Sequence, residues 1–355
     1  MTFLIAPDDS AAIEREIRAL RVWHHSRGPL NVALVYGGVS AEDRLYLAKS
    51  AVEQMSVTAL SETLSDLGAT FKILDPCDPA FVRSLLDYEV VLSNLHGPFG
   101  EDGRLQGLLD YLRMPYSGSS VAASAIAANK ILCKQTMGGL NLLTPPWWTW
   151  RPGTEVHWTG RPMMVKPALG GSSVGMNLVR TDADLVPALR EAWAVDPSPV
   201  LVEEYIEGTP VTVGVLELPM GLLVFPPLAT EVNDGWYDAD TKLTETTDTV
   251  SVAPAEFPAP VLDALTRRSR TLWDGLGCRG AARIDFIVTD SGQVHALEVN
   301  TTPGMSRKSN YALGAARCGL THADVVLAWL HNALTRPPYD VPLPIPVLDA
   351  RDTAA

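Results

Sequence analysis

The sequence is poor in cysteine and in positive charge, and it has no long apolar run. Its four cysteines lack a C-x-x-C pair, which favours reduced thiols in a cytoplasmic protein over a disulfide framework or a zinc site. No apolar run is long enough to span a bilayer, and the acidic N-terminal region is unlike a secretory signal. The 41 acidic residues outnumber the 28 Lys and Arg, and the net charge of −13 argues against nucleic-acid or anionic-membrane partners.

Several nucleotide-binding motifs are also missing. There is no G-x-x-x-x-G-K-[ST] phosphate loop and no kinase H-R-D or D-F-G set. The loop after the first expected strand lacks the G-x-G-x-x-G dinucleotide fingerprint, which argues against a nicotinamide cofactor. These absences leave room only for a nucleotide site of another kind.

Strands and helices alternate over about 31–117, which predicts a parallel α/β domain in a chain long enough for two or three domains. Ligands bind such sheets at the carboxyl ends of the strands, where the loops Gly37–Glu42 and His96–Gly103 lie. The expected elements of this domain are strands Asn31–Tyr36, Thr70–Leu74 and Glu89–Leu95 and helices Tyr46–Leu67 and Phe81–Leu86.

Helical and strand patterns continue on both sides of this domain. The apolar periodicity of Ser10–Trp23 predicts an amphipathic helix that packs on the body of the protein or on a partner subunit. One alanine-rich helix is expected over Ser119–Met137, then a Pro- and Trp-rich connection over Thr144–Pro162, and a Pro-rich surface tail from Arg336. The other expected elements are strands Met163–Val165 and Val200–Tyr205 and helices Asp182–Ala194, Pro258–Leu276 and Thr321–Leu334.

Four polar side chains are expected to share one face of a C-terminal hairpin. Two short apolar strands joined by a D-S-G-Q turn are predicted within Ala281–Val299. Because residues two apart share a strand face, Arg283 projects with Asp285 and Glu298 projects with Asn300. Such an oxygen-rich cluster suits Mg²⁺. The alternative is a surface ladder of salt bridges.

A glycine- and serine-rich loop, Gly170–Gly175, lies far from this cluster in sequence. Consecutive amides in such a loop can form a nest for phosphate oxygens, and glycines allow the positive φ angles that a nest requires. Lys166, at the end of a predicted strand, and Lys130 would supply positive charge. The alternative is an ordinary turn beside two solvated lysines, but the loop, the lysines and the acid cluster together favour a phosphate site.

Eight motifs follow one another along the chain. They are G-G-V-S-A-E (37–42), H-G-P-F-G-E-D-G (96–103) with Q-G (106–107), P-Y-S-G (115–118), K-P (166–167), G-S-S-V-G (171–175), G-C-R-G (277–280), R-I-D (283–285) and E-V-N-T-T-P-G-M (298–305). Each motif alone is weak, but their order and spacing resemble those of the ATP-grasp enzymes and, among them, the D-alanine–D-alanine ligase family.

The resemblance covers about Asn31–Leu334 and implies a three-domain ATP-grasp fold of the α/β class, α+β in its C-terminal half, with ATP between two antiparallel sheets. The domains it implies are an N-terminal helical arm (1–30), an α/β domain (31–118), a central ATP-grasp subdomain (119–204), a C-terminal ATP-grasp subdomain with the metal site (205–337) and a Pro-rich tail (338–355).

The resemblance also implies an ATP-dependent ligase that joins two amino acids, the first of them a D-amino acid, through an acyl phosphate. ATP and two Mg²⁺ or Mn²⁺ ions would be its cofactors. The ligase would be a cytoplasmic homodimer. The implied metal ligands are Asp285, Glu298 and Asn300. The implied nucleotide-binding residues are Lys130, Lys166, Gly171, Ser172, Ser173, Val174, Glu203, Glu204, Tyr205, Ile206 and Lys242. The implied substrate-binding residues are Glu42, His96, Leu243, Arg283, Gly304, Ser309 and Asn310, and the implied catalytic residues are Glu42, Ser172, Arg283 and Gly304.

Four positions depart from the pattern usual in that family. Pro210 stands where a ribose-binding Glu is usual, with Glu207 as an alternative, and Gly170 replaces another common Glu. Leu243 stands where a Tyr or His usually closes the mobile loop, and Asn310 replaces a Leu beside the second-substrate site.

These departures leave the acceptor open between D-alanine and another amino acid. An inactive ATP-grasp paralogue, acting as a nucleotide-binding or scaffold subunit, is an alternative from another class. An oxygen-metal hydrolase is a third alternative, but it would not account for the glycine loop or the paired lysines.

Overall fold

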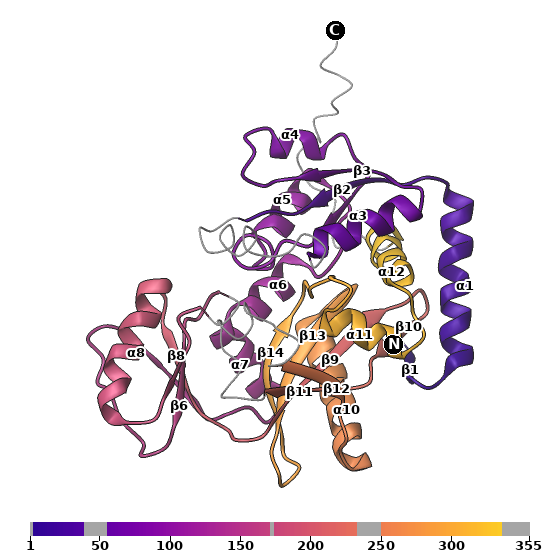
Figure 1. The fold of residues 1–355 in the computed structure, drawn as a ribbon. Helices are drawn as coiled ribbons and strands as arrows, with labels where there is room; N and C mark the ends of the chain where they lie inside the picture. Colours follow the sequence, from indigo (N-terminus) through magenta and orange to yellow (C-terminus); the bar gives the residue numbers. More distant parts are fainter. Residues whose placement is uncertain (1–2, 39–54, 171–173, 233–249, 336–355) are drawn as a thin grey trace.

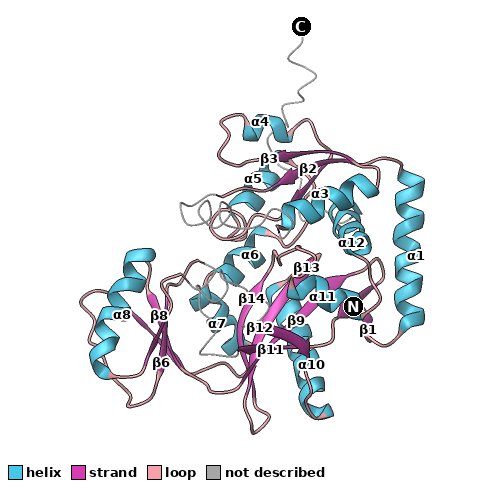
Figure 2. Cartoon of the chain, in the orientation of Figure 1, coloured by secondary structure: helices cyan, strands magenta, loops and turns pink. Residues whose placement is uncertain are grey.

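The computed structural model describes residues 3–38, 55–170, 174–232 and 250–335. These residues form three sheets of three, four and seven strands, with helices packed against them (Figure 1). Figure 2 shows helices both around the sheets and between them, such as α12 (His322–Thr335), which contacts strands of the three-stranded and of the seven-stranded sheet. The expected α/β class is therefore confirmed.

The three-stranded sheet is parallel, as predicted. Its middle strand β2 (Asn31–Val35) pairs with β3 (Thr70–Leu74) on one side and with β4 (Val90–Ser93) on the other. Alternate residues of β2 pack into two different hydrophobic cores, because a parallel strand is buried on both faces. The helices of this part are α3 (Ser56–Asp66), α4 (Phe81–Leu85) and α5 (Arg104–Leu112).

Helix α5 was not among the predicted elements. It follows Gly103, whose φ of 92° lies in the left-handed region that glycine adopts without strain. Its buried residues Leu105 and Leu109 are four apart, which gives a short helix one apolar stripe. The first part of the helix predicted over Tyr46–Leu67 lies outside the described residues, and its last part is α3.

The four-stranded sheet is antiparallel and lies in the middle of the sequence. Its order is β5-β8-β6-β7, and α8 packs on it. The Pro- and Trp-rich connection expected over Thr144–Pro162 contains a strand that was not predicted, because Trp147–Trp150 pairs with β8. Aromatic residues favour such half-buried strands. The elements are β5 (Trp147–Trp150), β6 (Met163–Lys166), β7 (Asn177–Val179), α8 (Asp182–Val195) and β8 (Val200–Glu204).

Two helices, rather than the single predicted one, precede this sheet. Helix α6 (Val121–Ala128) ends at Asn129, whose backbone is extended, and α7 (Lys130–Gly139) begins immediately after it. The Asn129 side chain accepts hydrogen bonds from the amides of Ile131 and Leu132, which makes it the N-cap of α7. Lys130 therefore lies at a helix start and not inside a helix.

The seven-stranded sheet forms the C-terminal half. Strand β13 (Ala281–Val288) lies between β9 (Thr209–Glu217) and β14 (Val294–Asn300), antiparallel to both, so the predicted hairpin is confirmed. Helix α11 was not predicted. The other elements are β1 (Phe3–Ile5), β10 (Gly221–Val224), β11 (Leu228–Val232), β12 (Val250–Pro254), α10 (Ala259–Leu276), α11 (Asn310–Arg317) and α12 (His322–Thr335).

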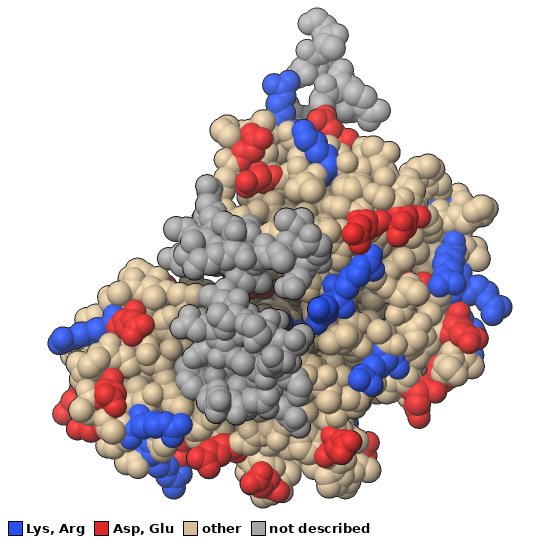
Figure 3. Space-filling view, viewed as in Figure 1, with Lys and Arg blue, Asp and Glu red and all other residues tan. Residues whose placement is uncertain are grey.

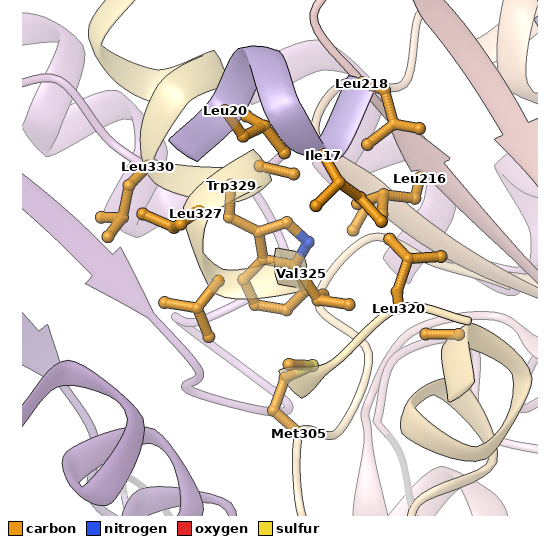
Figure 4. Close-up of a cluster of buried hydrophobic side chains, with 14 of the residues drawn as sticks. Ile17, Leu20, Leu216, Leu218, Met305, Leu320, Val325, Leu327, Trp329 and Leu330 are labelled. Atoms are coloured by element: carbon orange, nitrogen blue, oxygen red, sulfur yellow. The ribbon is translucent and has the colours of Figure 1, made fainter. Parts of the chain in front are cut away.

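The predicted N-terminal helix, α1 (Ser10–Arg27), packs on the body of the protein. Its Leu20 lies in the same buried cluster as Trp329 of α12 (Figure 4). Arg21 of α1 also pairs with Asp324 of α12 at 3.0 Å. The preceding strand β1, which was not predicted, runs parallel to β10 at the edge of the large sheet. The N-terminal segment is therefore part of the same hydrophobic core as the C-terminal helices.

Basic and acidic side chains are interspersed over the face of the molecule shown in Figure 3. Three of the four free cysteines are buried, and Cys77 is exposed. Within the described ranges, no helix is both long and apolar enough to cross a membrane.

Candidate active site

Four predicted site residues meet on one face of the β13–β14 hairpin. Asp285 lies directly opposite Glu298, and Arg283 lies directly opposite Asn300. Opposite residues of an antiparallel pair project to the same side of the sheet. The register therefore brings together two carboxylates, a carboxamide and a guanidinium, as the sequence predicted.

Arg283 holds the carboxylate of Asp285. Its Nε lies 3.1 and 3.2 Å from the two carboxylate oxygens, and its Nη2 lies 2.9 Å from Oδ2. The Glu298 carboxylate lies 4.0 Å from the same Nη2, and the Thr212 hydroxyl donates to Asp285 Oδ1 at 2.8 Å. Burial alone would lower the pKa of Arg283, but Asp285 and Glu298 raise it, so the guanidinium stays charged.

The donor set of this face fits a hard divalent cation. Asp285 and Glu298 supply carboxylate oxygens, and Asn300 adds a carboxamide. The Asn300 Nδ2 is buried and has no hydrogen-bond partner in the described part of the chain, so it could donate to an anionic ligand, whereas Oδ1 is the atom that could bind a cation. In the described part of the chain no three His, Cys, Asp or Glu side chains form a group that could hold a metal, so this face offers two carboxylates and one amide as oxygen ligands.

A third carboxylate, Glu101, lies beside this face and was not among the predicted site residues. Its Oε1 accepts a hydrogen bond from the amide of Gly97 at 3.0 Å. Burial raises the pKa of Glu101 to about 7 against the opposing effects of the Gly97 amide and of Arg283, and Glu298 raises it further. The G-E-D-G motif contained the residue, but the sequence alone did not indicate that its loop folds back toward β13.

Glu203 joins two lysines in the middle of the structure. Its Oε2 lies 2.6 Å from Lys134 Nζ, and its Oε1 pairs with Lys166 Nζ. Burial tends to raise the pKa of Glu203, but the two ammonium groups lower it overall, so the carboxylate is charged. Lys134 also donates to the hydroxyl of Thr144 at 2.5 Å. Lys134 was missed, although its place four residues after Lys130 puts both lysines on one side of α7.

Lys130 reaches the start of the glycine-rich loop. Its Nζ donates to the carbonyl of Gly170 at 2.6 Å. Burial lowers the pKa of Lys130, whereas the carboxylates of Glu298, Glu101 and Glu203 raise it. Lys130 is therefore electrostatically coupled both to the hairpin face and to the lysine pair. The structure brings these two predicted groups into one charged cluster.

The predicted nucleotide hinge, Glu203–Ile206, continues from β8. The backbone amides of Glu204 and Tyr205 donate to the carbonyls of Pro146 and Pro162, which fixes the course of the chain here. The Glu204 carboxylate pairs with Arg161 at 2.5 Å on the surface. Glu203 differs from its neighbours because its side chain binds the lysines.

The predicted acceptor residues lie on the segment after β14. Ser309 is the N-cap of α11, and its Oγ accepts from the amide of Ala312 at 3.2 Å. A Cβ built on Gly304 would meet Ser309 Cβ at 4.0 Å, so the two residues face each other. Asn310 is the first residue of α11. His96 is exposed in the loop that follows β4.

The remaining residues that the sequence singled out lie elsewhere in the structure or outside its described part. Val174 is exposed next to the glycine-rich loop, and Pro210 lies in β9 opposite Ile287 of β13. Six of the predicted residues lie outside the described part of the chain, namely Glu42, Gly171, Ser172, Ser173, Lys242 and Leu243.

Comparison with known proteins identifies the family. Family models described as "D-ala D-ala ligase C-terminus" and "D-ala D-ala ligase N-terminus" match residues 148–331 and 73–119. A D-alanine–D-alanine ligase of Syntrophotalea carbinolica is 34% identical over 308 residues, which are 86% of this chain and 96% of the relative. The chain belongs to the D-alanine–D-alanine ligase family. A second member, from Anaeromyxobacter dehalogenans, is 36% identical over 302 residues, 83% of this chain and 94% of that protein.

Solved structures of this ligase family share the fold. D-alanine–D-alanine ligase from Bacillus anthracis aligns with a TM-score of 0.73 and 25% identity over 86% of this chain and 98% of that one. D-alanyl-alanine synthetase A from Vibrio cholerae aligns with a TM-score of 0.75 and 22% identity over 86% and 99% of the two chains. The VanG D-Ala:D-Ser ligase from Enterococcus faecalis aligns with a TM-score of 0.65 and 23% identity over 86% of this chain and 100% of that one.

Proposed function

We propose that this member of the D-alanine–D-alanine ligase family is an ATP-dependent ligase that joins the carboxylate of one D-amino acid to the amine of a second amino acid, releasing ADP and phosphate. The relatives named D-alanine–D-alanine ligase support this reaction class. The observation that carries the proposal is the cross-strand pair Asp285–Glu298, with Arg283 and Asn300 on the same face and Lys130 coupled to it.

The first step activates the donor carboxylate, because a free carboxylate is a poor acyl donor. Its oxygen attacks the γ-phosphorus of ATP, giving an acyl phosphate and ADP. Lys130 and Lys166 would neutralise charge on the phosphoryl oxygens, and Glu203 holds Lys166 in place. Bound Mg²⁺, held by the carboxylates of Asp285 and Glu298 with the Asn300 amide, would neutralise the rest of this charge.

The second step forms the amide bond. The neutral amine of the acceptor attacks the acyl carbon, and negative charge develops on the carbonyl oxygen before phosphate leaves. Arg283 is charged and held by Asp285, so it can stabilise this oxygen together with the amide of Gly304. One such pre-organised donor contributes about 3 kcal/mol to the rate in other enzymes.

The described residues favour an active enzyme over an inactive paralogue. A protein that only binds nucleotide has no need for Arg283, the acid pair and the buried lysines in one cluster. The altered positions that support the paralogue are Pro210 and Leu243, and Leu243 lies outside the described residues.

The test is to incubate the purified protein with ATP, Mg²⁺ and pairs of amino acids, and to follow phosphate release and product mass. We expect phosphate release that depends on an amino-acid pair and a product of dipeptide mass. Glu298→Gln should bind nucleotide and lose turnover. If the wild type binds nucleotide but no pair supports phosphate release, the inactive paralogue is the correct assignment.

The same screen identifies the acceptor. Coupling of D-alanine to itself would place the protein among the dipeptide-forming members, and preference for another acceptor would support the altered specificity indicated by Asn310. We further propose that the protein is a cytoplasmic homodimer, which sedimentation equilibrium of the full chain would test.

A further inference from the structure

The segment between β14 and α11 carries Gly304 and is held by side chains from distant parts of the chain. Three backbone groups around Gly304 are bonded in this way: the carbonyl of Pro303 and both the amide and the carbonyl of Met305. Their partners are Asn94, which follows β4, Ser56 of α3 and His322 of α12.

Asn94 fixes the peptide plane in front of Gly304. Its Nδ2 donates to the carbonyl of Pro303 at 3.0 Å, and its side chain is 0% exposed. A carbonyl only accepts hydrogen bonds, so the amide nitrogen of Asn94 must be the atom that faces it. Because the peptide bond is planar and trans, the N–H of Gly304 points away from Asn94. No hydrogen-bond partner takes up that N–H among the described residues.

His322 fixes the peptide plane that follows Met305. Its Nε2 lies 2.9 Å from the carbonyl of Met305 and must donate to it. Its Nδ1 lies 2.7 Å from the hydroxyl of Thr63, a buried residue of α3. Burial lowers the pKa of His322, so the ring is neutral, and the Thr63 hydroxyl donates to Nδ1. The two bonds together define the tautomer and the orientation of the ring.

Met305 holds the peptide plane that directly follows Gly304. The Met305 side chain is 0% exposed and lies in the core beside α12 (Figure 4). Its amide donates to Ser56 Oγ at 3.0 Å, so this N–H is occupied and does not face a ligand. The amide of Gly304 is thus the unpaired donor of a segment in which three successive peptide planes, from Pro303 to Ser306, are each held by a side chain.

We infer that Asn94 and His322 are positioning residues that aim the Gly304 amide at the reacting acyl group: Asn94 fixes the peptide plane that carries this amide, and His322 fixes the plane two further along the segment. The inference rests on the proposed ligase function, and it adds two residues that do not touch the substrates. Neither residue belongs to the nucleotide or metal clusters, so their replacement should affect the coupling of amino acids and not the binding of ATP.

Kinetics of four variants test this assignment. Asn94→Ala and His322→Leu each remove one hydrogen bond to the segment, and each should lower kcat/KM for the amino-acid pair roughly tenfold, with the KM for ATP unchanged. His322→Gln places an amide nitrogen close to the position of Nε2 and should recover most of the loss. Thr63→Val removes the hydrogen bond to Nδ1 of His322 and should lower kcat/KM for the amino-acid pair by a smaller factor. This variant keeps the test open if Asn94→Ala does not fold.

Arg21→Met is the matched control. It removes the Arg21–Asp324 pair at the same end of α12, two residues from His322, without touching the segment. It should lower the melting temperature and leave both kinetic constants unchanged. If His322→Gln is as slow as His322→Leu, or if Arg21→Met is as slow as either, His322 acts only through stability.

Amide hydrogen exchange of residues 301–309 provides a readout that does not depend on activity. Exchange should rise in Asn94→Ala and His322→Leu and stay at the wild-type level in Arg21→Met. Equal exchange in all variants would overturn the positioning role. A wild type that couples no amino-acid pair would instead overturn the ligase proposal, and the exchange data would still decide whether these residues fix the segment.

Discussion

Lys134 and Glu203 form a buried ion pair, with 2.6 Å between Nζ and Oε2 and side-chain exposures of 1% and 3%. The pair joins α7 to the four-stranded sheet, and Lys166 of that sheet pairs with the second oxygen of the same carboxylate. A carboxylate shared between two ammonium groups keeps its charge when buried, because each group offsets part of its desolvation. This arrangement fixes Lys166 before any nucleotide binds.

We predict that Lys134→Met destabilises the protein by about 3 kcal/mol, the usual cost of removing one partner from a buried pair. Methionine fills most of the space but leaves Glu203 with one partner, and the KM for ATP should rise because Lys166 is then less well held. Urea unfolding and steady-state kinetics measure the two effects.

Arg161→Met is the control for this prediction. It breaks the pair of Arg161 with Glu204, the next residue of the same strand, but Arg161 is 73% exposed. Exposed pairs contribute little to stability because solvent screens them, so this variant should be nearly as stable as the wild type. Equal stability of the two variants would show that the buried pair has no special role.

A second prediction concerns Arg283→Lys. Lysine keeps the charge but cannot bind both oxygens of Asp285 with a planar fork, so its ammonium would be misplaced for the developing oxyanion. We expect kcat to fall on the order of 100-fold with little change in the KM for ATP. Arg307→Lys, at the exposed pair with Glu62, should keep its activity. Single-turnover measurements would locate the loss in the chemical step.

The hairpin face could be predicted because its information is local. Strand alternation and a short turn determine which side chains of Arg283, Asp285, Glu298 and Asn300 project together, and the register then follows from the turn. The break at Asn129 was missed because an alanine-rich pattern hides a capping residue that only the backbone geometry reveals.

The residues that support the site could not be predicted in the same way. Asn94 meets Pro303 from 209 residues away, and Thr63 meets His322 from 259 residues away. No periodicity encodes such pairs, since they depend on how the sheets pack. Glu101 is similar, because only the fold brings its loop next to Arg283 and Glu298.

A third prediction uses the raised pKa of Glu101. Its pKa is about 7 in the folded protein against 4.5 for the free side chain, so the folded state binds the proton more tightly. Stability from this group is therefore present below pH 4.5 and is lost as the pH rises toward 7. A pKa shift of this size corresponds to about 3 kcal/mol in the free energy of unfolding. We expect about 1 to 2 kcal/mol because the side chain is partly exposed.

Glu101→Gln tests this pH dependence, because glutamine keeps the acceptor for the Gly97 amide and carries no charge. Measured by urea unfolding, the variant should be more stable than the wild type at pH 8, and the difference should vanish below pH 4.5. Carboxylates that do not interact with Glu101 titrate equally in both proteins and cancel. A difference that is constant from pH 4 to pH 8 would contradict the assignment.

The last prediction compares two glycines of neighbouring motifs, Gly100 and Gly107. A Cβ on Gly100 would overlap the backbone carbonyl of Leu95, which cannot move without shifting the loop that carries Glu101. Gly100→Ala should therefore cost about 3 kcal/mol and reduce activity. A Cβ on Gly107, inside α5, would meet Val121 Cγ2 at an ordinary 3.9 Å. Gly107→Ala should raise the stability by about 0.5 to 1 kcal/mol, because alanine favours the helix. Thermal unfolding of both variants would measure the opposite shifts, and a stable, active Gly100→Ala would show that the loop does not need the close approach to Leu95.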